Sequence, residues 1–123
     1  MTDKPWESEP NNLLFESHGY VCEIRRHPNF GTLNGYVYIP LEHPIAQAKM
    51  PEDELNVHGG ITYWDERNGS FVVGFDCAHA GDVLPYRIDL TLDYADDTYK
   101  DIAFVTNELE NLAQQLKEKE NAN

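Results

Sequence analysis

The sequence predicts an α+β domain in which an antiparallel sheet of four to five strands packs against one long C-terminal helix. Short β-prone runs separated by turn residues fill the first half of the chain, and an Asn-Gly pair joins two further runs. The last quarter carries apolar residues at helical spacing. We expect one domain at residues 13–118, a flexible N-terminal arm at residues 1–12 and a frayed C-terminus at residues 119–123.

The first three strands are expected at residues 13–15, 20–25 and 33–39, where β-branched and aromatic residues lie between turn signals. His18-Gly19 supplies the first turn, and Pro28 and Pro40 end the second and third strands. Residues 41–50 form a short helix or an ordered loop, and residues 51–57 form an acidic loop.

A β-hairpin is predicted around Asn68-Gly69, because an Asn-Gly pair favours a type I′ turn, in which both central residues have positive φ. With these two residues as the loop, Arg67 pairs with Ser70. The same register places Gly60 opposite Cys77 and His58 opposite His79.

Two further elements are predicted after the hairpin, a strand or loop and a C-terminal helix. Ile88, Leu90, Leu92 and Tyr94 alternate with polar residues, which is typical of an edge strand, although an ordered loop fits as well. Thr98 or Asp97 is expected to cap a helix that runs to about residue 117. Its apolar stripe consists of Ile102, Val105, Leu109, Leu112 and Leu116. We expect this stripe to pack in the core or to form an oligomer interface.

The hairpin register predicts the candidate site. Opposite residues on antiparallel strands share a face, so His58, Cys77 and His79 are expected together at one end of the hairpin, here called the rim. Asp76 is expected on the other face of the sheet. Gly59-Gly60 leaves room for a ligand to approach the backbone, and the turn at residues 80–82 can bring Asp82 to the same rim. The predicted ligand-binding residues are His58, Gly59, Gly60, Asp76, His79, Asp82, Arg25 and Arg26.

Several roles stay open for this rim. His79, His58 and Cys77 are the candidate catalytic residues, since a thiol beside an imidazole is the minimum for nucleophilic catalysis. His58, Cys77, His79 and Asp82 are of the types that bind zinc, although no paired Cys-x-x-Cys or His-x-x-x-His spacing supports a metal. The histidines can equally be structural, and Cys77 a buried thiol. Arg25-Arg26 is either an anion clamp or a surface ion-pairing group.

Charge and composition exclude several classes of function. The net charge of −13 repels nucleic acid and anionic membranes, so no direct nucleic-acid or membrane binding is expected. The excess acidic residues either keep the protein soluble or mimic the phosphate backbone of a nucleic acid. They cluster at residues 51–54 and at Asp89, Asp93, Asp96, Asp97 and Asp101. Two cysteines are too few for a disulfide framework, and no membrane-length apolar run or signal peptide is visible, so a cytoplasmic protein is expected.

Several segments resemble a family of small proteins encoded by phages and prophages. They include residues 19–26, 33–37 and 99–101, the run His58-Gly59-Gly60-Ile61-Thr62-Tyr63 and the run from Gly74 to Asp82. The resemblance covers roughly residues 18–116 and transfers no catalytic residue. It implies a protein that works in the cytoplasm of an infected host cell, where small accessory phage proteins often act against host defence.

Three functions follow from these observations. The first is a phage accessory protein that binds a small polar or anionic ligand, such as a host-defence nucleotide signal, in the pocket at His58, His79 and Asp82. The second is a hydrolase or nucleotide-modifying enzyme, with or without zinc. The third is an acidic decoy that inhibits a nucleic-acid-binding defence protein. A homo-oligomer through the helix stripe or the 88–94 edge is compatible with each.

Overall fold

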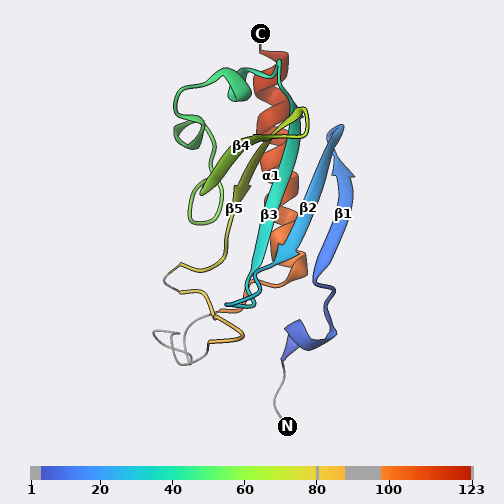
Figure 1. Ribbon diagram of the computed structural model, residues 1–123, viewed down its shortest axis with the longest axis vertical. Helices are drawn as coiled ribbons and strands as arrows, with labels where there is room; N and C mark the ends of the chain where they lie inside the picture. The colour runs from blue at the N-terminus through green and yellow to red at the C-terminus, as the bar shows by residue number, and fades with distance from the viewer. Residues whose placement is uncertain (1–3, 80, 88–97, 123) are drawn as a thin grey trace.

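A five-stranded antiparallel sheet carries one long helix on one face in the computed structural model, which describes residues 4–79, 81–87 and 98–122 (Figure 1). This arrangement confirms the predicted fold class. The strands lie in the order β1-β2-β3-β5-β4. Their bounds, with those of the helix, are β1 (Asn12–Ser17), β2 (Tyr20–Arg26), β3 (Leu33–Pro40), β4 (Tyr63–Arg67), β5 (Ser70–Phe75) and α1 (Ile102–Asn121).

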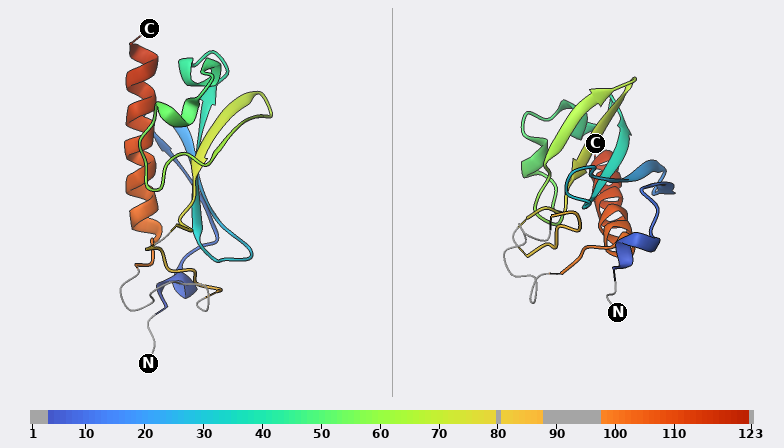
Figure 2. Two further views of the ribbon diagram at one scale, coloured as in Figure 1. Left: turned by 90° about the vertical axis from the view of Figure 1, so that its left-hand side faces the viewer. Right: turned by 60° about the horizontal axis from the view of Figure 1, so that its bottom comes forward.

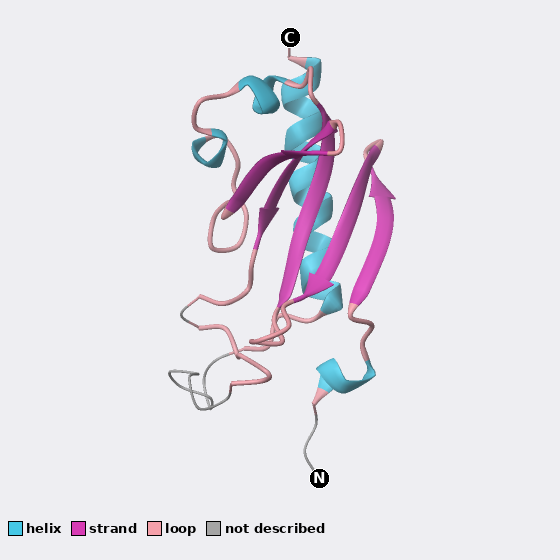
Figure 3. Ribbon diagram, viewed as in Figure 1, coloured by secondary structure: helices cyan, strands magenta, loops and turns pink. Residues whose placement is uncertain are grey.

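Short 3-10 helices lie in the arm and in the long connection between β3 and β4 (Figure 3). They are η1 (Pro5–Ser8), η2 (Pro44–Gln47) and η3 (Pro51–Asp53). Each has a proline in its first turn, where the missing N–H has no helical acceptor to lose. Residues 41–50 therefore form an ordered loop with one short helical turn.

Two tight turns have the backbone that their sequences predict. His18 and Gly19 have φ values of 54° and 86°, and Asn68 and Gly69 have 53° and 85°, so all four are left-handed. Arg67 pairs with Ser70 as predicted, and the ladder continues to Tyr63, which pairs with Gly74. Beyond that pair only the Thr62 N–H donates across, to Gly74 O at 2.9 Å.

The core lies between the sheet and α1 (Figure 2). A row across the sheet joins Cys22, Val37 and Val73, each fully buried. The helix buries four members of the predicted stripe and also Ala113, whereas Ile102 is only partly buried. The stripe is therefore core and is not free to form an oligomer interface.

The helix lies very close to the central strand. A Cβ placed at Gly35 would lie 2.9 Å from the Phe75 ring and 3.0 Å from Leu109. Because each large aliphatic side chain buried here stabilises the fold by about 1.5–3 kcal/mol, this contact between β3 and α1 anchors the two layers.

The predicted helix boundaries are wrong at both ends. The N-cap is Asp101, whose carboxylate accepts from the Phe104 N–H at 2.8 Å, and not Thr98 or Asp97. The helix continues to Asn121, so the C-terminus expected to fray from residue 119 is largely helical. The predicted strand at residues 88–94 lies outside the described residues.

The arm at residues 1–12 also differs from the prediction, because from Lys4 onward it is attached to the domain. The Trp6 ring lies edge-on to Tyr99, with centroids 4.9 Å apart, and Glu9 Oε2 accepts from the Ile102 N–H at 2.9 Å. Asn12 already belongs to β1. A polar composition predicted flexibility here, but the polar side chains are used in contacts with the start of α1.

The face of the sheet away from α1 holds a buried carboxylate, Glu23. It accepts hydrogen bonds from the Tyr38 hydroxyl at 2.7 Å, Asn12 Nδ2 at 2.9 Å and Arg25 at 3.0 Å. Burial raises the pKa of Glu23, but these hydrogen bonds outweigh it, so the pKa is lowered.

A lowered folded-state pKa means that Glu23 stabilises the protein above the ordinary glutamate range and loses this contribution as pH falls through the folded value. We expect Glu23→Gln to lower the free energy of unfolding by about 1–3 kcal/mol at neutral pH. The gap between the unfolding free energies of wild type and variant should narrow as the pH is lowered. Urea unfolding at several pH values measures this gap. The exposed Glu110→Gln is the control, and a gap independent of pH would contradict the assignment.

Candidate functional site

The candidate site lies at the end of the sheet where the loop after β5 meets the segment before α1 (Figure 1). The two chain segments are joined by backbone hydrogen bonds, from Thr98 N to Gly81 O at 2.9 Å and from Val83 N to Thr98 O at 3.0 Å. Asp82 and Thr98 form an isolated parallel bridge. This bridge holds Asp82 against the segment that leads into α1.

Asp82 is the centre of the site. Its side chain is 1% exposed, and both carboxylate oxygens lie 3.0 Å from Nε2 of His58. Lys100 Nζ lies 3.2 Å from Oδ1, and the backbone N–H of His79 donates to Oδ2 at 3.0 Å. A buried carboxylate is stable only with such partners, so Asp82 holds three segments of the chain together.

The His58 ring is fixed on several sides. It lies edge-on to Phe104, with centroids 5.2 Å apart, and the backbone N–H of His58 donates to Glu108 Oε1 at 2.7 Å. Because the Asp82 carboxylate faces Nε2, that nitrogen holds the ring proton, and Nδ1 is left as an acceptor. Nδ1 has no partner among the described residues, and the side chain is 23% exposed.

His79 stands next to His58, as predicted, with ring centroids 5.8 Å apart and planes at 74°. Strand pairing does not bring them together, since the ladder ends at Tyr63 and Gly74. Gly59 brings them together instead, because its φ is +69° and a Cβ there would lie 2.2 Å from Nε2 of His79.

A regular strand would place Asp76 on the face opposite to the histidines, but Asp76 does not lie there. The strand ends at Phe75, and Asp76 Oδ1 accepts from the Ala78 N–H at 3.1 Å and lies 3.0 Å from Nε2 of His79. The contact with His79 lacks the alignment of a hydrogen bond. Both side chains are 32% exposed, but Nε2 of His79 is itself buried, so the exposed part of this ring lies elsewhere.

Gly60 has φ +84°, and a methyl group added at its Cα would meet no atom within 4 Å, so its conformation, and not crowding, favours glycine. The predicted room for a ligand beside Gly59-Gly60 is therefore present only at Gly60, because the His79 ring occupies the space beside Gly59.

Cys77 does not share the rim with the histidines. It is 1% exposed and belongs to the hydrophobic core, and burial, then the nearby Asp82 and Asp76 carboxylates, raise the pKa of its thiol. A thiol held in its neutral form is a poor nucleophile. The geometry therefore favours the buried-thiol interpretation of Cys77.

We expect neither cysteine to react with a thiol reagent in the native protein. Cys22 is also buried, and burial followed by the charge of Glu110 raises the pKa of its thiol to about 11. Titration with 5,5′-dithiobis(2-nitrobenzoate) should detect two thiols in denaturant and none within minutes under native conditions. Rapid native labelling of Cys77 would contradict this account and restore it as a candidate nucleophile.

The zinc hypothesis gains no support from the geometry. In residues 4–79, 81–87 and 98–122, no group of three or more His, Cys, Asp or Glu side chains is arranged to hold a metal ion. His58 and His79 each face a different carboxylate, and Cys77 faces the core.

Arg25 and Arg26 do not form a clamp, because neighbouring residues on a strand point to opposite faces. Arg25 is on the face with Glu23, whereas the Arg26 side chain is only 3% exposed. Strand β3 also separates β2 from the hairpin. The site at His58 therefore receives neither arginine.

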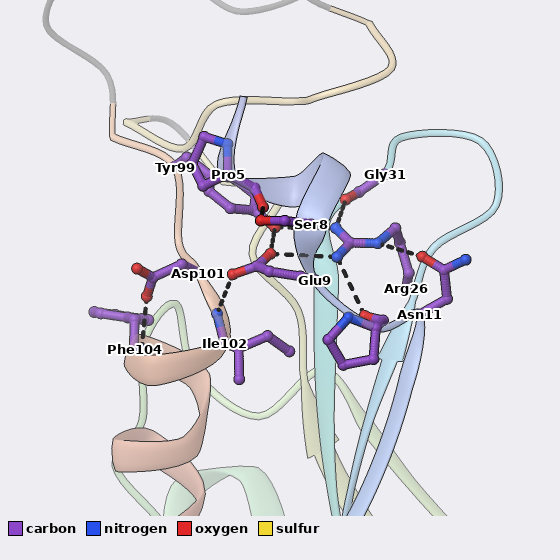
Figure 4. A network of polar contacts seen from close by, with 11 residues as sticks. Pro5, Ser8, Glu9, Asn11, Arg26, Gly31, Tyr99, Asp101, Ile102 and Phe104 are labelled. Atoms are coloured by element: carbon purple, nitrogen blue, oxygen red, sulfur yellow. Dashed lines mark hydrogen bonds and ion pairs between the residues drawn. The ribbon is translucent and has the colours of Figure 1, made fainter. Parts of the chain in front are cut away.

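Arg26 instead forms a polar hub that ties the arm to the domain (Figure 4). All five of its N–H groups have acceptors, so none is free for an anion. The acceptors are Asn11 Oδ1 at 2.9 Å, Gly31 O at 2.8 Å, the Tyr99 hydroxyl at 3.0 Å, Glu9 Oε1 at 3.3 Å and Pro10 O at 3.4 Å.

Sequence reasoning missed Lys100 as a member of the site. Tyr99 and Lys100 are adjacent, and the Tyr99 hydroxyl contacts Glu9 and Arg26 while Lys100 contacts Asp82. These two residues therefore connect the polar hub to the histidine pair. Their place just before the helix cap, in one of the segments that resemble the phage family, does not specify a partner.

A scan against protein-family models finds no match, and comparisons with curated proteins and with solved structures find no significant similarity. Within the described parts of the chain, no helix combines the length and apolar character needed to cross a bilayer. The fold and site define a two-layer α+β domain with a carboxylate-anchored histidine pair. Function is therefore argued from the geometry of that pair.

Proposed function

We propose that the protein binds a small polar or anionic ligand at the face formed by His58 and His79. The observation that carries this proposal is the pairing of two partly exposed imidazoles, 5.8 Å apart, each with a carboxylate at Nε2. The His58 ring is suited to recognition, because Asp82 fixes its orientation before a ligand arrives, and His79 adds a second imidazole beside it.

The ligand would meet the free edges of the two rings. Nδ1 of His58 is available to accept a hydrogen bond from a ligand hydroxyl or amide, and a protonated imidazole supplies charge for an anionic group. Asp82 is buried and already has its partners, so its role is to position His58. Gly60 leaves open space beside this face, since an added Cβ there would meet no atom within 4 Å.

A second function is favoured by the contact between His58 and Asp82. A carboxylate that fixes the proton on one imidazole nitrogen and leaves the other as a base is the arrangement of general acid–base catalysis. Under this alternative, His58 is the base, Asp82 positions it and Lys100 lies beside the carboxylate. Cys77 has no part in it, because its thiol is buried.

The resemblance to proteins of phages and prophages makes a nucleotide signal of host defence the first ligand class to test, in the host cytoplasm. The acidic-decoy hypothesis rests on Asp89, Asp93 and Asp96, which lie outside the described residues. It therefore stays a prediction, tested by charge reversal at these three positions with His58→Ala as the contrasting variant.

The experiment for ligand binding starts with the full chain purified from infected bacterial cells, from which bound small molecules are released by denaturation and identified by mass spectrometry. A compound recovered intact and enriched over the double variant His58→Ala/His79→Ala supports binding. The control is His18→Ala, which changes an exposed histidine in a distant turn. A compound retained equally by all variants, or none above background, would refute the assignment.

Turnover is distinguished with the identified compound itself. Incubation with the wild-type chain gives an unchanged compound if the protein sequesters it, and a new product if His58 acts as a base. Loss of that product in Asp82→Asn, while Cys77→Ala retains it, would establish the second function in place of the first.

A further inference from the structure

Two cavities near the N-terminal arm share part of their lining. One has a volume of about 490 Å³ and includes Trp6 and Glu7, the other has about 300 Å³ and includes His27, and Asn11 and Tyr86 line both. These volumes are in the range of small-ligand sites. Neither cavity is lined by a residue of the histidine site.

Tyr86 offers a fixed aromatic surface to both cavities. Its ring packs directly against Gly31, where an added Cβ would lie 2.7–2.9 Å from three ring atoms and where φ is +76°. The backbone N–H of Tyr86 donates to Phe30 O at 2.9 Å. Tyr86 is nevertheless 49% exposed, so its ring is held against Gly31 and is still open to solvent.

Two hydrogen-bond donors, from His27 and Asn11, line the cavities with this ring, and Lys4, Glu7 and Glu9 line the larger cavity as well. Nδ1 of His27 accepts from the backbone N–H groups of Asn29 and Phe30, each at 3.1 Å, so Nε2 carries the proton. Asn11 Oδ1 accepts from Arg26 Nε at 2.9 Å, which orients the amide and leaves Nδ2 as a donor. Nε2 of His27 and Nδ2 of Asn11 have no partner among the described residues.

We propose that these two adjacent cavities bind a ligand that combines a planar ring with a hydrogen-bond acceptor group, the chemistry of a mononucleotide. The ring stacks on Tyr86, with Trp6 as the second aromatic of the lining, and the acceptor oxygens meet Asn11 and His27. Lys4, in the lining of the larger cavity, supplies a cation for a single phosphate, whereas the net charge of −13 disfavours a longer nucleic acid, because each added phosphate increases the repulsion. The site is separate from the histidine pair and does not depend on its proposed function.

The test uses fluorescence of Trp6 in a Trp64→Phe background, which removes the other tryptophan of the chain. The probes are adenosine 5′-monophosphate, adenosine and inorganic phosphate, added to the full chain. We expect saturable binding of the nucleotide, with weaker binding of adenosine and of phosphate alone. Tyr86→Leu, which keeps an apolar side chain over Gly31, should weaken nucleotide binding about tenfold, and Tyr86→Phe should preserve it.

His58→Ala separates this inference from the proposed function, since it should leave nucleotide binding at Tyr86 unchanged. The proposal is overturned if none of the probes binds saturably, if Tyr86→Leu binds as tightly as wild type, or if phosphate alone binds as tightly as the nucleotide. Loss of binding in His58→Ala with no effect of Tyr86→Leu would move the nucleotide to the histidine site and also refute it. Thermal melting of each variant shows that it is folded.

Discussion

Replacing Arg26 by methionine is expected to lower the free energy of unfolding by about 3–5 kcal/mol, because it removes one partner from a buried, hydrogen-bonded charge pair. Glu9 keeps its contact with the Ile102 N–H but loses its cation, and Gly31 O loses a buried donor. The arm at residues 4–11, the loop after the second strand and the segment before α1 all meet at this guanidinium (Figure 4).

The adjacent Arg25→Met is a matched control for that experiment. Arg25 is 46% exposed, and Glu23 keeps its hydrogen bonds from Tyr38 and Asn12 when the ion pair is lost, so this substitution should cost no more than about 1 kcal/mol. Urea unfolding of both variants at neutral pH gives the comparison. Equal losses for the two arginines would contradict the assignment of Arg26 as the hub of the N-terminal region.

Asp82→Ala is the second substitution with a large expected effect. It leaves the Lys100 ammonium, which is 14% exposed, without its carboxylate, and it removes the acceptor from the His79 N–H. Uncompensated buried charge and an unsatisfied donor together should lower the free energy of unfolding by about 2–4 kcal/mol. The loops that carry the histidines should also lose protection from amide hydrogen exchange.

Asp65→Ala is the control, since Asp65 lies exposed on the edge strand β4. It should change the free energy of unfolding by less than about 0.5 kcal/mol. If Asp82→Ala is as mild as this control, or if exchange in the loops is unchanged, Asp82 does not organise the site. Lys100→Met in the Asp82→Ala background should restore part of the loss by removing the unpaired charge.

The hairpin was predictable because its signal is local. Asn68-Gly69 specifies a turn with two positive φ values, and the turn specifies the register of Trp64 with Val73. The apolar stripe of α1 was predictable for the same reason, since periodicity over a few turns defines a buried face. Both signals depend on residues that are close together in the sequence.

The partners at the site were not predictable in this way. His58 and His79 were expected to meet through strand pairing, and they meet through the left-handed backbone of Gly59 instead. Lys100 reaches Asp82 only because Thr98 bridges the two segments, which is a tertiary arrangement that no local pattern encodes.

Arg26 shows a different limit of the sequence. Two adjacent arginines on an acidic chain favoured a joint anion site, but strand alternation places them on opposite faces. Burial then changes the role of one of them: an arginine that satisfies all five N–H groups internally is a structural residue, although its sequence context equals that of its neighbour.

Histidine side-chain NMR tests the central claim most directly, namely that the buried carboxylate of Asp82 fixes the ring of His58. Long-range ¹H–¹⁵N spectra of the full chain should place the His58 proton on Nε2, with slow solvent exchange that is lost in Asp82→Asn. A His58 ring that exchanges as fast as the exposed His18 and is unaffected by Asp82→Asn would contradict the account.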